Sequence, residues 1–210
     1  MQAARGTSVD RHESDGPPAA RMPVRRTWSL FLAVAAVLYA ADQVTKHLAV
    51  THLADRPDVR VIGEVLQLHL TYNPGAAFSL GTEFTVGLTV LATVATGVVL
   101  WISRRVGDRI WAVALGLLLA GIDGNLTDRL VRDPAPLRGH VVDFLMLPNW
   151  PVFNVADICI NIAVGLILLQ VFRGIAVDGT RVDRPTADDS SDTDGPGEGA
   201  TDPAPEGDEE

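Results

Sequence analysis

The sequence predicts an all-α integral membrane protein with four transmembrane helices and a small β-sheet cradle on the extracytoplasmic side. The first observation is an uncharged run of twenty residues at 84–103, because about 18 or more such residues are enough to span a bilayer. The second is a set of three shorter uncharged runs, at 28–41, 110–122 and 158–172. Each of these continues at one end into polar residues that can still be helical, so we expect three further spans with polar ends.

The alternative fold class is a soluble helical bundle with one buried helix. A surface helix of a soluble protein carries a polar face opposite its apolar stripe. Residues 84–103 have no such face. We therefore favour the membrane protein over the soluble bundle.

Composition divides the chain into an N-terminal cytoplasmic tail (residues 1–26), a membrane domain (27–173) and an acidic cytoplasmic tail (174–210). The last segment holds twelve Asp and Glu residues against two Arg, so it accounts for the formal net charge of −9. Segments of this composition bury too little apolar surface to fold, and we expect both tails to be disordered. No basic stripe with interleaved aromatic residues is present, so no nucleic-acid partner is expected.

Arginines near the ends of the predicted helices set the orientation. One cluster precedes the first helix, one fills the link between the second and third, and one follows the fourth. They are Arg21, Arg25 and Arg26; Arg104, Arg105 and Arg109; and Arg173, Arg181 and Arg184. Positive residues favour the cytoplasmic side, so both termini should be cytoplasmic. All the polar helix ends then meet at the outer membrane boundary.

The first external connection has the pattern of a strand pair. Residues 66–72 alternate apolar and polar side chains, which is typical of a half-exposed strand. Val59 and Val61 indicate a partner strand, and the intervening Gly63–Glu64 indicates a turn. We expect a small sheet on the outer surface.

Two acids have a basic partner four residues further along a predicted helix. These pairs are Asp42 with Lys46, the chain's sole lysine, and Asp128 with Arg132. The Asp42–Lys46 pair is equally consistent with an ion pair that closes the helix end and with a role in handling substrate.

The third predicted helix also carries small and polar residues at regular spacing. Gly121 and Gly124 permit close contact between helices. Asn125 shares a face with Asp128 and Arg129. Packing explains the glycines better than it explains an Asn, an Asp and an Arg together on one face.

Three acids, Asp123, Asp143 and Asp157, lack a local basic partner. A carboxylate in a dry site without a cation resists ionisation, and two such groups close together share a proton. One can then act as a base and the other as an acid, as aspartic peptide hydrolysis requires. A proton-coupled carrier also needs intramembrane acids, and a non-enzymatic membrane assembly factor would use the polar ends only for packing.

Cysteine and histidine usage gives no metal or redox centre. A single cysteine, Cys159, excludes a disulfide within the chain, and the five histidines are scattered without ligand spacing. We therefore expect no metal and no cofactor.

Five motifs, "DQVTK", "NPGAAF", "GNLTDR", "VVDF" and "FNVAD", follow one another between residues 42 and 157. The order and positions of these motifs resemble those of bacterial signal peptidase II, the prolipoprotein signal peptidase, and the resemblance covers roughly residues 28–172. The resemblance implies a metal-free aspartic endopeptidase of the bacterial cytoplasmic membrane with its active site near the outer leaflet. It also implies cleavage of lipidated prolipoproteins before a diacylglyceryl-modified cysteine, inhibition by globomycin, and contact with membrane lipids. We expect a monomer.

The resemblance also assigns roles to residues. It makes Asp143 and Asp157 the catalytic pair. The residues that it implies support the site or bind substrate are Asp42, Lys46, Asn73, Asn125, Arg129 and Asn154. Two positions depart from the family pattern: Ala120 stands where Gly is frequent, and Asp123 stands where an apolar residue is usual.

Overall fold

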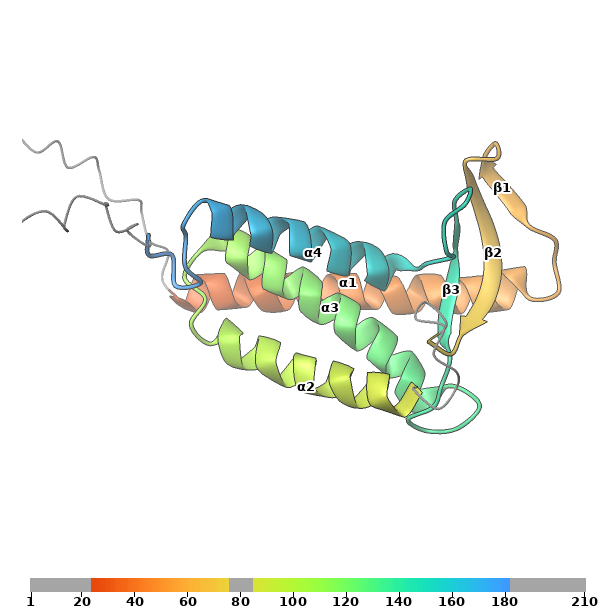
Figure 1. Ribbon diagram of the computed structural model, residues 1–210, viewed down its shortest axis with the longest axis horizontal. Helices are drawn as coiled ribbons and strands as arrows, with labels where there is room; N and C mark the ends of the chain where they lie inside the picture. Colours follow the sequence, from red (N-terminus) through yellow and green to blue (C-terminus); the bar gives the residue numbers. More distant parts are fainter. Residues whose placement is uncertain (1–23, 76–84, 182–210) are drawn as a thin grey trace, which may run out of the picture.

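The computed structural model describes residues 24–75 and 85–181 (Figure 1). Most of the two predicted tails (1–23 and 182–210), part of the motif NPGAAF and the first residue of the second predicted span lie outside the described residues. Within them, seven elements follow in chain order. They are helix α1 (Val24–Leu53), strands β1 (Val59–Ile62) and β2 (Leu66–Asn73), helices α2 (Thr85–Ser103) and α3 (Arg109–Val131), strand β3 (Val141–Met146) and helix α4 (Val155–Phe172).

The four helices of the described part are each long and apolar enough to cross a membrane, which confirms the predicted spans. Helices α1 and α3 extend well past their uncharged runs, because the polar residues at 42–46 and 123–129 continue the helices. Asn154 caps the N-terminus of α4. The polar residues at the ends of these three helices are therefore continuous with the membrane-spanning segments.

Helix α3 is the centre of the bundle, lying between α4 and α2 and packing against all three other helices (Figure 1). Two glycines allow this close approach. A Cβ on Gly121 would lie 2.6 Å from the carbonyl oxygen of Ala156, and one on Gly124 would lie 2.5 Å from Oδ2 of Asp42. The predicted close contact at both glycines is confirmed, and it brings α1, α3 and α4 together at the level of the polar residues.

An antiparallel sheet in the order β1-β2-β3 lies at one end of the bundle (Figure 1). The predicted pair of strands, β1 and β2, is confirmed, although nearly all of β2 is half-buried and its burial does not alternate. Strand β3 was not predicted. Its first four residues are all buried. Such a strand does not need the alternation of apolar and polar residues that marks a half-exposed strand, and its sequence does not show it.

The opposite end of the bundle is closed by residues that follow α4. Trp111 Nε1 donates a hydrogen bond to the carbonyl of Ile175, and the backbone N–H of Gly107 donates to the carbonyl of Val177, both at 2.9 Å. Ile175 and Val177 pack against the apolar core around Trp111. The segment predicted as an acidic tail thus begins with residues, 174–181, that the structure places against the helices.

Candidate active site

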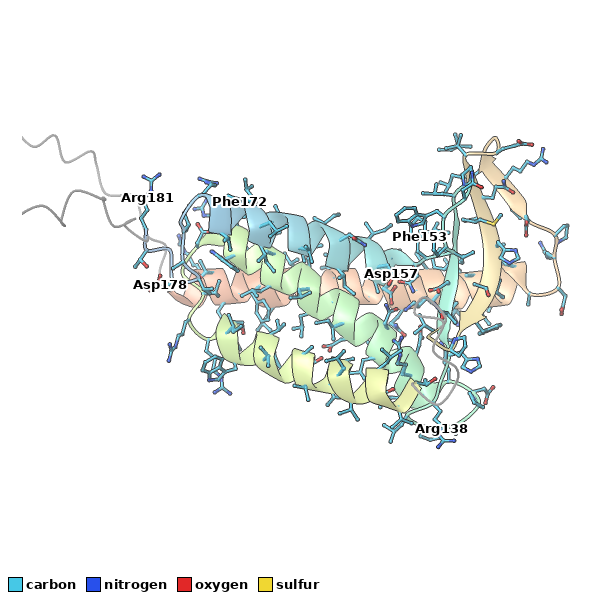
Figure 2. The ribbon with its side chains drawn as sticks, viewed as in Figure 1. Arg138, Phe153, Asp157, Phe172, Asp178 and Arg181 are labelled. Atoms are coloured by element: carbon cyan, nitrogen blue, oxygen red, sulfur yellow. The ribbon has the colours of Figure 1, made fainter. Side chains whose placement is uncertain are left out.

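Asp143 and Asp157 are presented by two different elements at the junction of the bundle and the sheet. Asp143 is the third residue of β3 and is only 2% exposed. Asp157 lies in the first turn of α4, and Figure 2 shows it where the helices meet the sheet. Here Asn154 caps the helix by accepting a hydrogen bond from the backbone of Asp157, while the Asp157 carboxylate accepts one from the backbone of Asn154. This reciprocal capping box holds the Asp157 side chain against the helix end.

The carboxylate of Asp143 is held by two asparagine amides. Asn73 Nδ2, from the end of β2, donates to Oδ2 at 2.9 Å. Asn154 Nδ2 donates to Oδ1 at 2.6 Å and also to the carbonyl of Val142. Both oxygens of a nearly fully buried acid therefore have a partner, which its burial requires.

The carboxylate of Asp157 is held from α3 and from its own helix end. Asn125 Nδ2 donates to Oδ1 at 2.9 Å, and the backbone N–H of Asn154 donates to Oδ2 at 3.1 Å. Asn154 therefore contacts both acids, through its side-chain amide on Asp143 and its backbone on Asp157. The side-chain oxygen of Asn154 caps α4, and its NH₂ group faces Asp143.

The environment of Asp143 favours its protonated form. Burial raises the pKa of Asp143 to about 6, and the nearby charge of Asp157 adds to the rise. The hydrogen bonds from Asn73 and Asn154 act in the opposite direction, because they stabilise the ionised carboxylate. Asp157 lies in the first turn of α4 and is only half-buried, whereas Asp143 is almost completely buried. The two acids are therefore placed in unequal surroundings, as acid–base pairs require.

Both acids line one cleft of about 430 Å³. Most of its wall is apolar and comes from the segment between β3 and α4 and from the first two turns of α4. Beyond the two acids, the lining residues are Asn73, Trp150, Pro151, Val152, Phe153, Ile158, Asn161 and Ile162. The described residues, 24–75 and 85–181, contain no cluster of three or more His, Cys, Asp or Glu side chains that could hold a metal ion.

A buried ion network lies directly behind the two acids. Lys46 Nζ is 3.0 Å from Asp42 and 2.8 Å from Asp128, and all three side chains are at most 1% exposed. Arg132 Nε lies 2.5 Å from the other oxygen of Asp128. The predicted pairs Asp42–Lys46 and Asp128–Arg132 are confirmed. The contact between Lys46 and Asp128, which joins α1 to α3, was not predicted.

This network also holds the two elements that carry the acids. Asp42 Oδ1 accepts a hydrogen bond from the backbone N–H of Ala156 at 2.9 Å, in the turn that carries Asp157. Asp128 Oδ2 accepts one from the backbone N–H of Val142 at 3.2 Å, next to Asp143. Asp128 is thus a positioning residue, and it was not among the site residues predicted from the sequence. Its pairing with Arg132 was visible in the sequence, but its contact with β3 joins residues from different elements.

The remaining predicted residues lie around the same cluster. Lys46 Nζ donates to Asn125 Oδ1 at 2.9 Å, so the network reaches the amide that holds Asp157. Arg129 Nη1 donates to the carbonyl of Asn125 at 3.2 Å. Its Nε is buried with no hydrogen-bond partner in the described part of the chain.

Asp123 faces away from the cleft and accepts a 2.6 Å hydrogen bond from Thr96 of α2.

The chain matches the family model for signal peptidase (SPase) II over residues 34–173. It is 46% identical over 149 residues to a lipoprotein signal peptidase from Leifsonia xyli subsp. xyli, which covers 70% of this chain and 69% of the relative. It is 45% identical over 179 residues to a lipoprotein signal peptidase from Mycobacterium avium, which covers 85% and 97% of the two chains.

Solved structures agree with these sequence matches. A structure described as a bacterial membrane enzyme superposes with a TM-score of 0.62 at 26% identity, over 69% of this chain and 94% of that one. A second structure with the same description gives a TM-score of 0.61 at 25% identity, over 69% and 88%. The match to the family model covers most of the membrane domain and both acids. The chain therefore belongs to the signal peptidase II family of lipoprotein signal peptidases and is a multi-pass bacterial membrane peptidase.

Proposed function

We propose that this protein is an aspartic endopeptidase that removes signal peptides from prolipoproteins by cleaving before the diacylglyceryl-modified cysteine. The observation that carries the proposal is the pair Asp143 and Asp157 in one cleft, each held by asparagine amides and placed in unequal surroundings. The family relationship supports the removal of signal peptides. The catalytic type rests on the geometry of the pair, and the site of cleavage rests on the resemblance to the family.

In the proposed mechanism, Asp143 carries the proton and Asp157 is ionised. Asp157 takes a proton from a water molecule as its oxygen attacks the carbonyl carbon of the residue before the lipidated cysteine. Asp143 donates a hydrogen bond to the carbonyl oxygen and stabilises the tetrahedral intermediate. The C–N bond then breaks, and the cysteine nitrogen leaves as an amine after taking the proton held by Asp157.

Two α3 residues orient these groups in the proposal. Asn125 fixes Asp157 through its amide and is itself fixed by Lys46. Arg129 offers a buried Nε–H that no described residue accepts. A backbone carbonyl of the bound peptide is a suitable acceptor for this donor. We also propose that globomycin occupies the same cleft and that the protein acts as a monomer.

Lipidation of the substrate should be required for efficient cleavage. Acyl chains in the membrane contribute about 0.8 kcal/mol per buried CH₂, so they hold the modified cysteine at the boundary where the cleft lies. We expect purified protein to cleave a diacylglyceryl-modified prolipoprotein, with a mobility shift on a gel, and to leave the unmodified precursor uncut. Equal rates on both substrates would contradict this account of specificity, while no cleavage of either would contradict the proposed activity.

The orientation in the membrane is part of the proposal: both termini are cytoplasmic and the sheet is external. The arginine clusters before α1, between α2 and α3, and after α4 support it. Reporters fused after residue 70, in β2, and after residue 106, between α2 and α3, should report opposite sides of the membrane. The same side for both would overturn the orientation and the extracytoplasmic position of the cleft.

The pH dependence of cleavage should follow the ionisation of Asp143. Its pKa of about 6 means that the proton is present below that pH and is lost above it. We therefore expect kcat/KM, which reports the free enzyme, to fall on the alkaline side with an apparent pKa near this value. Asn73→Ala removes a hydrogen bond that lowers the pKa of Asp143, so its alkaline limb should move to higher pH.

The control for this shift is Asp58→Asn, which removes an exposed acid paired with His69 on the sheet. It should leave the profile unchanged. An alkaline limb that stays in place in Asn73→Ala, or moves to lower pH, would show that Asp143 does not carry the required proton.

A further inference from the structure

A groove of about 470 Å³, separate from the cleft, lies between α1 and α3. Its volume is within the range of about 300–1,000 Å³ typical of small-molecule sites. Leu32 and Ala36 of α1 and Leu119 of α3 line one half, which is entirely apolar. In a membrane protein such a groove is open to lipid.

The other half of the groove carries polar side chains beside Leu126 and Leu130, and we call it the polar half. It contains Tyr39, Asp123 and Thr127. Both helices run in the same direction, so these residues lie toward the end of the bundle that carries the two acids. Asp123 is about 3 Å along the helix axis from Asn125, whose amide holds Asp157. The polar half is therefore nearly level with the active site, on another face of α3.

This polar half presents acceptors only. Thr96 uses its hydroxyl hydrogen on Asp123 Oδ1 at 2.6 Å, and Thr127 uses its own on the carbonyl of Asp123 at 2.7 Å. The 3.0 Å contact between Tyr39 and Thr127 must then be donated by Tyr39. Asp123 Oδ2 has no hydrogen-bond partner among residues 24–75 and 85–181, so the groove offers a carboxylate oxygen to a donor.

We propose that the groove binds a membrane phospholipid with a primary ammonium headgroup, of the phosphatidylethanolamine class. One acyl chain lies along the apolar half, and the ammonium donates to Asp123 Oδ2. Polar groups at membrane depth are costly unless they face a partner or a cavity, and a charge-assisted hydrogen bond supplies the partner. A choline headgroup has no N–H to donate, and a glycerol headgroup leaves the lipid anionic beside a carboxylate.

The test is lipid binding to the full-length protein in detergent, measured by native mass spectrometry. Dioleoyl phosphatidylethanolamine should bind about tenfold more tightly than dioleoyl phosphatidylcholine, because its ammonium can donate a charge-assisted hydrogen bond to Asp123 and choline cannot. Asp123→Asn should remove this preference. Asp58→Asn, which changes an exposed acid just before β1, should keep it.

A second variant tests the apolar half without changing Asp123. Ala36→Phe fills the groove and should weaken binding of both lipids while keeping their ratio. Equal binding of the two lipids by the wild-type protein would overturn the proposal. So would a preference that persists in Asp123→Asn, tighter binding of phosphatidylglycerol, or binding unaffected by Ala36→Phe. Both variants should still cleave prolipoprotein, so loss of lipid preference is distinct from failure of the proposed activity.

Discussion

Replacing either Asp143 or Asp157 with asparagine should abolish cleavage while the protein remains folded and inserted. Asparagine has the size of aspartate but can neither accept a proton from water nor hold the shared one. General acid–base groups contribute about 10²–10⁴-fold each, and loss of either removes both functions of the pair. We expect kcat to fall by roughly three orders of magnitude or more for each variant, measured on a lipidated prolipoprotein.

The two losses should not add, because the acids act as a unit. The double variant should therefore be no more impaired than the worse single variant. Each asparagine brings an NH₂ group toward a donor amide, at a cost of about 1–3 kcal/mol, so the thermal midpoint of each purified variant should be measured beside its activity.

Asp123→Asn is the matched control, because Asp123 contacts Thr96 and not the cleft. It should retain substantial activity. A dead Asp123→Asn together with near wild-type turnover in Asp143→Asn or Asp157→Asn would show that the wrong acids have been assigned.

Replacing Lys46 with methionine should unfold a large fraction of the protein. The change leaves Asp42 and Asp128 buried without the cation that lies 3.0 and 2.8 Å from them. Removing one partner of a buried ion pair costs about 3–5 kcal/mol, a large part of the stability of a typical domain. Folded yield and resistance to denaturant in detergent should both fall sharply.

Arg60→Met is the control for this loss. Arg60 pairs with Glu64 at 3.6 Å on the sheet, where the two side chains are 67% and 80% exposed. Exposed pairs contribute about 0–1 kcal/mol, so this variant should unfold like the wild type. If Lys46→Met were as stable as Arg60→Met, the buried network would not hold α1, α3 and α4 together.

The four spans, the β1–β2 pair and the ion pairs within single helices were predictable because each depends on residues close together in the chain. An uncharged run long enough to cross a bilayer is visible without any partner. Spacing of four on a helix likewise placed Asp42 beside Lys46, and the structure confirms it. The site residues came from ordered motifs, whose resemblance to a family carries information that no local pattern holds.

Tertiary structure alone decided how these pieces meet. Helix geometry turns Asp123 about 200° from Asn125, but only packing determines that the face of Asn125 is the one opposite Asp157. Three sets of contacts join residues from different elements. Lys46 pairs with Asp128, Asp128 accepts a hydrogen bond from the backbone of β3, and Asn154 contacts both acids. The reason is physical: burial makes a polar group satisfy its hydrogen bonds with whichever partner the packing supplies. That partner is set by contacts between elements, which the spacing of residues along the chain does not specify.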